Sequence, residues 1–264
     1  MGALAACGAC LAAAWPLDGA ALAVWGWRLP LVGGLAVNVA AAGARLVVLR
    51  DPQEGMSLAE VEDRHAVNLG RLIRSSWRRV LAVAAMGTFP AASFYLVCAT
   101  LPAYLSDVTG VAPHVALGVH LANLFVLTLV IPLGGWMADG VGRTTTLLTS
   151  AAVTGALAYP VWMLVGVGLP AVAWLGQLLL VVGFGLFQGA LAESAVMALP
   201  KGMRATGLNL ADALASALGG GLAPLAGVAL VAATADDASP AYVMIGAAAL
   251  SAAACWAVRR TDLF

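Results

Sequence analysis

The stretch Ile131–Thr149, IPLGGWMADGVGRTTTLLT, interrupts a long apolar sequence for only a few residues. Glycine allows a tight turn and a close approach of two backbones, and Gly135 and Gly142 flank the break. Asp139 can accept hydrogen bonds from the amides that open a following helix. Arg143 can pair with a neighbouring acid or helix end. The stretch therefore predicts a short hairpin, pinned by its polar side chains, between two long apolar helices.

The composition indicates what surrounds these helices. The chain of 264 residues is 62% hydrophobic and 10% charged, with a formal net charge of zero and a mean hydropathy of +0.95. Soluble domains contain roughly 45–50% apolar and about 25% charged residues. So few charges cannot cover the surface of a soluble protein of this size. The sequence therefore predicts an all-α integral membrane protein, surrounded by a lipid bilayer and with no nucleic-acid partner.

Gly, Pro and charged residues separate the chain into eight apolar segments that are candidate membrane spans. A helix of about 20 residues, at 1.5 Å each, crosses a ~30 Å hydrocarbon core. The first segment is short for a span, at about 21 Å if it is helical. The predicted spans are Ala3–Pro16, Leu29–Leu49, Val80–Leu105, Val115–Ala138, Thr145–Gly166, Ala171–Leu199, Thr206–Ala233 and Ala241–Val258.

Basic residues lie on one side of this arrangement. Twelve of the 13 Lys and Arg residues lie on that side, in alternate loops or near the end of the span that leads into one; only Arg28 lies on the other. Cytoplasmic loops carry an excess of Lys and Arg, so we expect both termini in the cytoplasm and Trp25, Trp27 and Arg28 at the outer interface. The composition is rich in Ala and Arg and poor in Lys, which favours a bacterial origin. We therefore expect a multi-pass protein of the bacterial inner (plasma) membrane.

Residues 51–79 form the one long polar stretch of the chain. Ser57 with Glu60 makes a capping box, which predicts the start of a helix. Apolar residues recur along the stretch, so we expect an amphipathic helix on the membrane surface with its arginines near lipid headgroups. Such a helix is either a solvated connector or a regulatory element.

The hairpin resembles the loop signature of the major facilitator superfamily. Gly135-x-x-x-Asp139-x-x-Gly142-Arg143 is similar to the C-terminal copy of that signature, between the eighth and ninth helices. The family usually has a second basic residue after the arginine, and this chain has Thr144 there. The resemblance therefore does not imply the full charge network of the loop.

Further stretches resemble the metabolite:proton symporter branch of this family. They are similar to the opening of its sixth helix, the end of its seventh, and the segment that joins its tenth and eleventh. All occur in the expected order with the expected helices between them. They are Trp25–Pro30 (WGWRLP), Leu101–Leu105 (LPAYL), and Leu199–Gly207 (LPKGMRATG) followed by Gly219–Pro224 (GGGLAP).

The resemblance implies that the eight spans correspond to helices five to twelve of a twelve-helix bundle. Residues 1–50 would then be a remnant of the N-terminal half, 51–79 the cytoplasmic connector, and 80–264 the C-terminal six-helix half. It also implies a secondary transporter that moves a small organic metabolite with a proton by alternating access, without a cofactor. The alternative is a membrane protein that does not transport: a half-carrier that associates with itself or a partner chain, or an inactive fragment.

Enzyme chemistry is not expected. The sequence has no Walker loop, no H-E-x-x-H and no Ser-nucleophile motif. Cys7 and Cys10 form a C-x-x-C without a second Cys or His pair nearby, so we expect small residues on a helix face. No catalytic or metal-binding residue is therefore predicted.

Two acids inside predicted spans are candidates for proton coupling, because ionisable groups in a membrane are costly. Glu193 lies about 10 Å, and Asp212 about 12 Å, from the cytoplasmic ends of consecutive helices. Two facing carboxylates could share a proton. Alternatively, each bonds a neighbouring helix or contacts Arg204 and Lys201 in a cytoplasmic gate. The related proteins usually have an acid where this chain has Met197 and an aromatic residue at position 212, so neither acid inherits a family role.

Other polar residues in the spans are candidates for lining a cavity. His120 and Asn123 lie within one turn of each other in the fourth span. An intramembrane His is either a neutral hydrogen-bond partner or a proton relay. Tyr95 and Gln188 are predicted to line the cavity together with Asn123.

Overall fold

The protein is helical throughout its regular structure. In the computed structural model, the predicted all-α class is confirmed, since no strand occurs among the residues that the structure describes, which are 2–14, 21–48, 58–107, 110–167 and 169–260. The chain divides into two compact units, Met1–Gly70 and Arg71–Phe264. The three-part division of the sequence stays a prediction.

In the first unit, two helices fall where the first two spans are predicted. Helix α1 (Gly2–Ala14) has 13 residues, about 20 Å. Helix α3 (Arg28–Val48) has 21 residues, about 31 Å, enough to cross a membrane. A short π-helical turn, η1 (Leu22–Gly26), precedes α3. The predicted span ends Pro16 and Leu49 lie outside the described residues.

Aromatic and basic side chains meet at the start of α3. The guanidinium carbon of Arg28 lies 4.3 Å from the centre of the Trp27 ring. Its Nη1 donates a hydrogen bond to the Val24 carbonyl oxygen at 2.5 Å. Both Trp25 and Trp27 are about half exposed. This arrangement suits an interfacial anchor, where aromatic rings lie at headgroup level.

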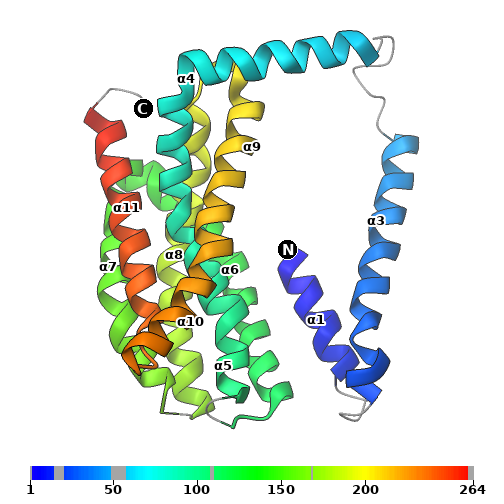
Figure 1. Cartoon of the computed structure of the whole chain (residues 1–264), viewed down its shortest axis with the longest axis vertical. Helices are drawn as coiled ribbons and strands as arrows, with labels where there is room; N and C mark the ends of the chain where they lie inside the picture. Colours follow the sequence, from blue (N-terminus) through cyan, green and yellow to red (C-terminus); the bar gives the residue numbers. More distant parts are fainter. Residues whose placement is uncertain (1, 15–20, 49–57, 108–109, 168, 261–264) are drawn as a thin grey trace. The chain divides into compact units, whose positions relative to one another are not determined.

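In the second unit, the helices run side by side (Figure 1), and six helical segments among the described residues are long and apolar enough to cross a membrane. The last six predicted spans are therefore confirmed, and the chain is a multi-pass membrane protein. The segments are Arg74–Asp107, His114–Val141, Arg143–Val165, Pro170–Ala198, Lys201–Thr234 and Pro240–Arg259.

Two of these segments contain a local change of helix type. The first contains α4, a π-helical stretch η2 and α5, and the fifth contains a 3-10 turn η3, α9, a π-helical stretch η4 and α10. The elements are α4 (Leu58–Phe94), η2 (Tyr95–Thr100), α5 (Leu101–Asp107), α6 (Pro113–Val141), α7 (Arg143–Val165), α8 (Pro170–Ala198), η3 (Lys201–Met203), α9 (Arg204–Ala215), η4 (Ser216–Leu222), α10 (Ala223–Thr234) and α11 (Pro240–Arg260).

Helix α4 corrects one prediction. The sequence predicts a surface helix within 51–79 and a separate span from Val80, whereas α4 runs without a break from Leu58 to Phe94. Gly70 does not end the helix, since a single interior glycine costs only about 1 kcal/mol. The predicted capping residue Ser57 lies outside the described residues.

Glycines bring α6 and α8 into backbone contact. A Cβ on Gly134 would collide with the backbone of Leu186, and a Cβ on Gly189 would collide with the Ile131 carbonyl oxygen. A Cβ on Gly185 would lie 3.0 Å from Leu127 and Val130 side-chain atoms. Small residues allow helices to approach this closely in a membrane. Gly185 and Gly189, four residues apart on α8, therefore permit its close packing against α6.

A side chain of α11 hydrogen-bonds to the backbone of α4. The Ser251 hydroxyl donates to the Ala85 carbonyl oxygen at 2.7 Å and accepts from the Phe89 amide at 3.1 Å. These two backbone groups are the acceptor and the donor of one turn of an α-helix. The next residue is Pro90, which cannot donate to the helix. Inserted side chains and proline are both causes of helix bending.

Candidate functional site

The hairpin between α6 and α7 has the tight turn that its glycines predict. Helix α6 ends at Val141 and α7 begins at Arg143, with Gly142 alone between them. Gly142 has a φ of +100°, a conformation that side chains rarely adopt. The other motif glycine, Gly135, is packed less tightly. A Cβ there would lie 3.9 Å from the Gly189 carbonyl oxygen, which is an ordinary contact.

Asp139 does not take the predicted role. We expected its carboxylate to cap the helix that follows, but α7 has no side-chain capping hydrogen bond. The physical reason is its position. Asp139 still lies within α6, whereas a capping residue occupies the non-helical position before the first turn, here Gly142. Asp139 instead lines a cavity of about 490 Å³ together with Arg143 and Arg259.

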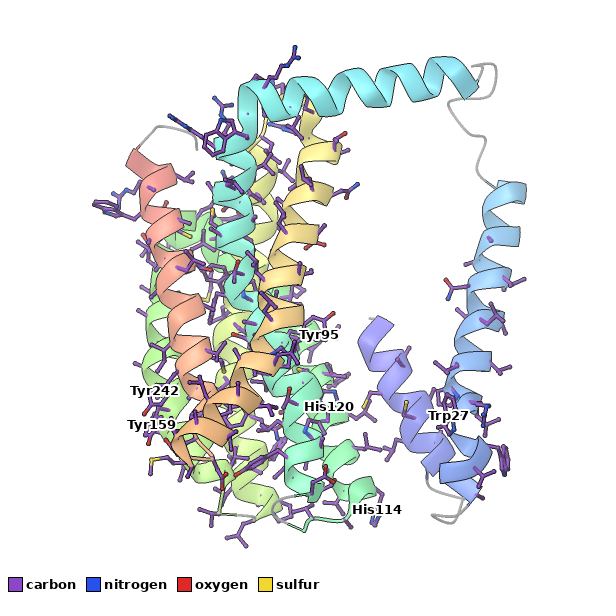
Figure 2. All side chains as sticks on the ribbon, in the orientation of Figure 1. Trp27, Tyr95, His114, His120, Tyr159 and Tyr242 are labelled. Carbon is purple, nitrogen blue, oxygen red and sulfur yellow. The ribbon has the colours of Figure 1, made fainter. Side chains whose placement is uncertain are left out.

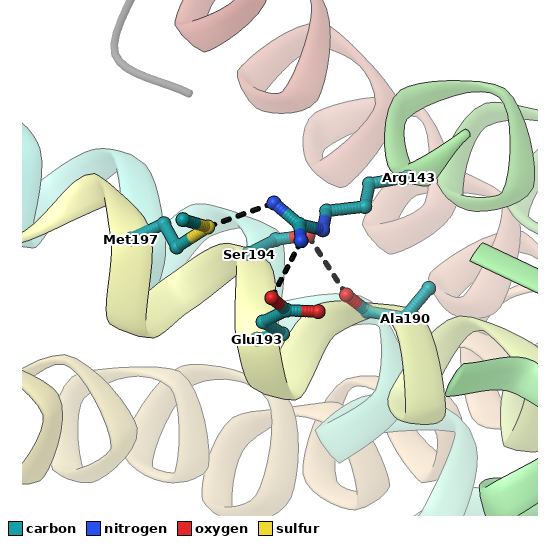
Figure 3. Close-up of polar contacts among 5 residues, drawn as sticks. All are labelled: Arg143, Ala190, Glu193, Ser194 and Met197. Atoms are coloured by element: carbon teal, nitrogen blue, oxygen red, sulfur yellow. Dashed lines mark hydrogen bonds and ion pairs between the residues drawn. The ribbon is translucent and has the colours of Figure 1, made fainter. Parts of the chain in front are cut away.

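Arg143 joins the start of α7 to the end of α8 (Figure 3). Its Nη2 donates to Glu193 Oε1 at 2.5 Å, and its Nη1 donates to Met197 Sδ at 2.7 Å. The predicted pairing of Arg143 with a neighbouring acid is present, and that acid is Glu193. The pair is open to solvent, with side-chain exposures of 31% and 52%.

This ion pair changes the interpretation of Glu193. The sequence predicted that Glu193 faces Asp212, bonds a neighbouring helix, or contacts Lys201 and Arg204 in a gate. Among the described residues, Glu193 pairs with Arg143 alone. The Nε of Arg204 donates a hydrogen bond to the Leu199 carbonyl oxygen at 3.2 Å. Glu193 is not among the residues that line the cavity of Asp212, so the structure gives no contact between the two carboxylates.

Asp212 lies in a separate cavity of about 280 Å³ between α4, α8 and α9. Gln188, which the sequence predicted to line a cavity, lines this one, and Asn209 lines it as well. Sequence reasoning missed Asn209, although its position one turn before Asp212 places both on one helix face. The other lining side chains are apolar, for example Val83 and Leu191. Within the described part of the chain, no cation or hydrogen-bond donor pairs with the Asp212 carboxylate.

His120 and Asn123 are both buried, and the role of Asn123 in lining a cavity stays a prediction. Asn123 is 1% exposed, and its Nδ2 donates to Gln177 Oε1 at 2.7 Å, which joins α6 to α8. Three buried atoms, His120 Nδ1, Asn123 Oδ1 and Gln177 Nε2, have no partner among the described residues. Sequence reasoning did not single out Gln177. The feature that could have identified it is that it is a lone amide in the apolar first half of α8.

Tyr95 is exposed over 41% of its surface and packs across η4. A Cβ on Gly220 would lie 2.6 Å from its ring, so only glycine fits there. Figure 2 shows Tyr95 and His120 apart from the Tyr159–Tyr242 pair, whose rings stack at 5.3 Å.

A second group of polar residues lies at the end of the bundle opposite the hairpin between α6 and α7. The Tyr159 hydroxyl donates to Asp236 Oδ2 at 3.2 Å, and the Ala238 amide donates to Asp236 Oδ1 at 2.9 Å. These bonds hold the turn between α10 and α11. Sequence reasoning missed them, because no periodicity links residues 159 and 236.

Comparisons with known proteins agree with this architecture. The sequence matches the Major Facilitator Superfamily over residues 1–224. It is 28% identical over 254 residues to a citrate-proton symporter of Klebsiella pneumoniae, covering 93% of this chain and 55% of that protein. It is 30% identical over 220 residues to an alpha-ketoglutarate permease of Escherichia coli, covering 81% and 49%.

A third relative is an ectoine/proline transporter of Corynebacterium glutamicum, 28% identical over 231 residues, covering 83% of this chain and 46% of that protein. The chain thus spans about half the length of the curated relatives it matches. No solved structure matches it at a significant level.

Proposed function

The chain belongs to the major facilitator superfamily, and we propose that it acts within a secondary transporter that moves a small organic metabolite together with a proton. The observation that carries this proposal is the cavity with Asp212, Gln188 and Asn209 in an otherwise apolar wall. Solute sites of such carriers lie near the bilayer midplane between repeated halves. The relatives support the class of solute, since their names include citrate, alpha-ketoglutarate and proline.

Asp212 is the residue that we assign to proton coupling or to a cationic group of the solute. It lies about 12 Å along the helix from Arg204, well inside the segment Lys201–Thr234. A carboxylate at that depth is costly without a function. Because it faces a cavity and has no cation paired with it among the described residues, it is available to bind a proton.

The Arg143–Glu193 pair has a different role in this proposal. It joins the start of α7 to the end of α8, close to the boundary of the membrane. Both side chains are partly exposed. Such a pair can open and close at little cost, because exposed ion pairs contribute only about 0–1 kcal/mol. We assign it, with Arg204, to a gate or positioning contact.

The buried group His120, Asn123 and Gln177 serves as a structural contact between α6 and α8 in this proposal. Its direct hydrogen bond joins neutral amides. His120 remains a second candidate for the proton, since its Nδ1 is buried without a partner among the described residues.

The remaining parts of the proposal concern placement and assembly. We place both termini in the cytoplasm and the protein in the bacterial inner membrane, from the side on which Lys and Arg gather. The eight spans would correspond to helices five to twelve of the family bundle. The cavity wall opposite Asp212 would come from further helices, either of a longer chain or of a second chain, which includes another copy of this one.

Uptake into inverted and right-side-out membrane vesicles tests the proposal. Vesicles from cells that produce this chain are offered radiolabelled citrate, alpha-ketoglutarate or proline, with an imposed pH gradient. We expect accumulation of at least one solute above vesicles without the chain, and its loss when a protonophore collapses the gradient. Accumulation of none of them, or accumulation that ignores the protonophore, would contradict the proposal.

A further inference from the structure

A further cavity, of about 530 Å³, lies between α4 and α11. Three arginines of α4 line it: Arg74, Arg78 and Arg79. Arg74 and Arg78 are one turn apart, so their guanidinium groups project from the same helix face. Like charges at this spacing repel each other. The cavity therefore concentrates positive charge at one place on the bundle.

Among the described residues, no acid forms an ion pair with these three arginines. The ion pair Arg143–Glu193 lies elsewhere. The guanidinium carbon of Arg78 lies 5.5 Å from the centre of the Trp77 ring. A cluster of basic groups without acidic partners attracts anions and is stabilised by them.

The cavity also has an apolar wall at the level where the membrane begins. The first membrane segment starts at Arg74 and the last one ends at Arg259. Beyond the arginines, the lining continues with Ala82, Ala257 and Val258, and Trp77 is half exposed beside them. The ligand that fits is an amphiphile, with an anionic head for the arginines and a hydrocarbon part for the wall.

We propose that this cavity binds the phosphate headgroup of an anionic phospholipid. Arginine presents several donors in a planar fork that matches phosphate oxygens and binds them in pairs. The phosphodiester would lie between Arg74 and Arg78, and the first part of the acyl chains would cover Trp77 and Val258. Inorganic phosphate shares the head chemistry but would leave the apolar wall uncovered. This site goes beyond transport and does not depend on it.

Native mass spectrometry of the delipidated chain in detergent tests this site, with phosphatidylglycerol and phosphatidylcholine as probes. We expect one phosphatidylglycerol to be retained preferentially. The double variant R74Q/R78Q should bind it about 30-fold more weakly, from roughly fivefold for each basic residue near an anionic surface. The matched variant K201Q/R204Q removes the same charge elsewhere and should bind normally. A melting curve without lipid checks that each variant is folded.

The remaining outcomes separate the alternatives. Equal loss in both double variants would overturn the proposal, because it would mean attraction by overall charge. Displacement of the lipid by millimolar inorganic phosphate would show a phosphate site and overturn the lipid assignment. If R74Q/R78Q fails to fold, the comparison of the two lipids on the wild-type chain still tests the proposal. Equal retention of phosphatidylglycerol and phosphatidylcholine by the wild type would overturn it. In W77A we expect weaker phosphatidylglycerol binding, because the acyl chains lose part of the apolar wall.

Discussion

Glu193 and Asp212 are two carboxylates at similar depths on consecutive helices, yet their surroundings differ. Glu193 lies 2.5 Å from an Arg143 nitrogen and is half exposed. Asp212 lies in a cavity whose other polar groups are the neutral amides Gln188 and Asn209. A paired acid holds helices in place, whereas an acid without a cation can take up a proton. Depth in the membrane therefore does not by itself assign a role to an acid.

The largest expected effect comes from neutralising Asp212. The D212N variant imitates the protonated acid, so it should lose accumulation driven by a pH gradient by on the order of 100-fold, as when a positioned proton-transfer group is removed. Exchange of labelled for unlabelled solute should persist, because that half-reaction needs no net proton movement. Vesicle uptake and counterflow measure the two activities.

Two variants control for the loss of an acid. E193Q removes the paired carboxylate and should change accumulation less than about fivefold. D107N changes an exposed aspartate at the end of α5 and should have no effect. If D212N and E193Q lose accumulation equally, the contrast between the two acids is wrong.

The second prediction concerns the close contact between α8 and α6, the helix that leads into the hairpin of Arg143. In G189A the new Cβ would collide with the Ile131 carbonyl oxygen, and overpacking of this kind costs about 1–3 kcal/mol. Thermal unfolding in detergent measures the loss of stability. Gly118 of α6 has open space around it, so G118A is the matched control and should be neutral or slightly stabilising. Equal stability of the two variants would contradict the close approach of α6 and α8.

The third prediction concerns the buried amides, which hold α6 to α8 without any charge. N123L leaves the Gln177 amide unsatisfied and should cost about 1–3 kcal/mol. Adding Q177L should recover part of this loss, because both amides are then gone. The coupling energy of the double-mutant cycle should lie near 0.6 kcal/mol, the average for such bonds in membranes. Strictly additive effects would mean that the two side chains do not interact.

The smallest effect should come from the Arg143–Glu193 pair itself. Its side chains are 31% and 52% exposed, and solvent-exposed pairs contribute about 0–1 kcal/mol. R143Q should therefore lower the unfolding temperature only slightly, and high salt should reduce the difference from wild type. A large loss that persists at high salt would show that Arg143 has a structural role beyond this pair.

Much of the fold could be predicted from the sequence, because span length and turn chemistry are local properties. Apolar runs of about 20 residues located the last six membrane segments, and Gly142 marked a turn where φ is positive. The family followed from short motifs in the right order. The continuous helix from Leu58 was missed, since its one weak residue, Gly70, does not break it.

The tertiary structure alone decided what each polar side chain contacts. Residues 143 and 193 lie 50 positions apart, and residues 123 and 177 lie 54 apart, so no helical period connects them. Which neighbour each one reaches depends on how every helix is rotated about its own axis. Between α6 and α8, the close contacts at Gly134 and Gly189 limit that rotation. The sequence therefore determined that two acids enter the membrane, and the packing of the helices decided which one is neutralised by a cation and which one faces the cavity.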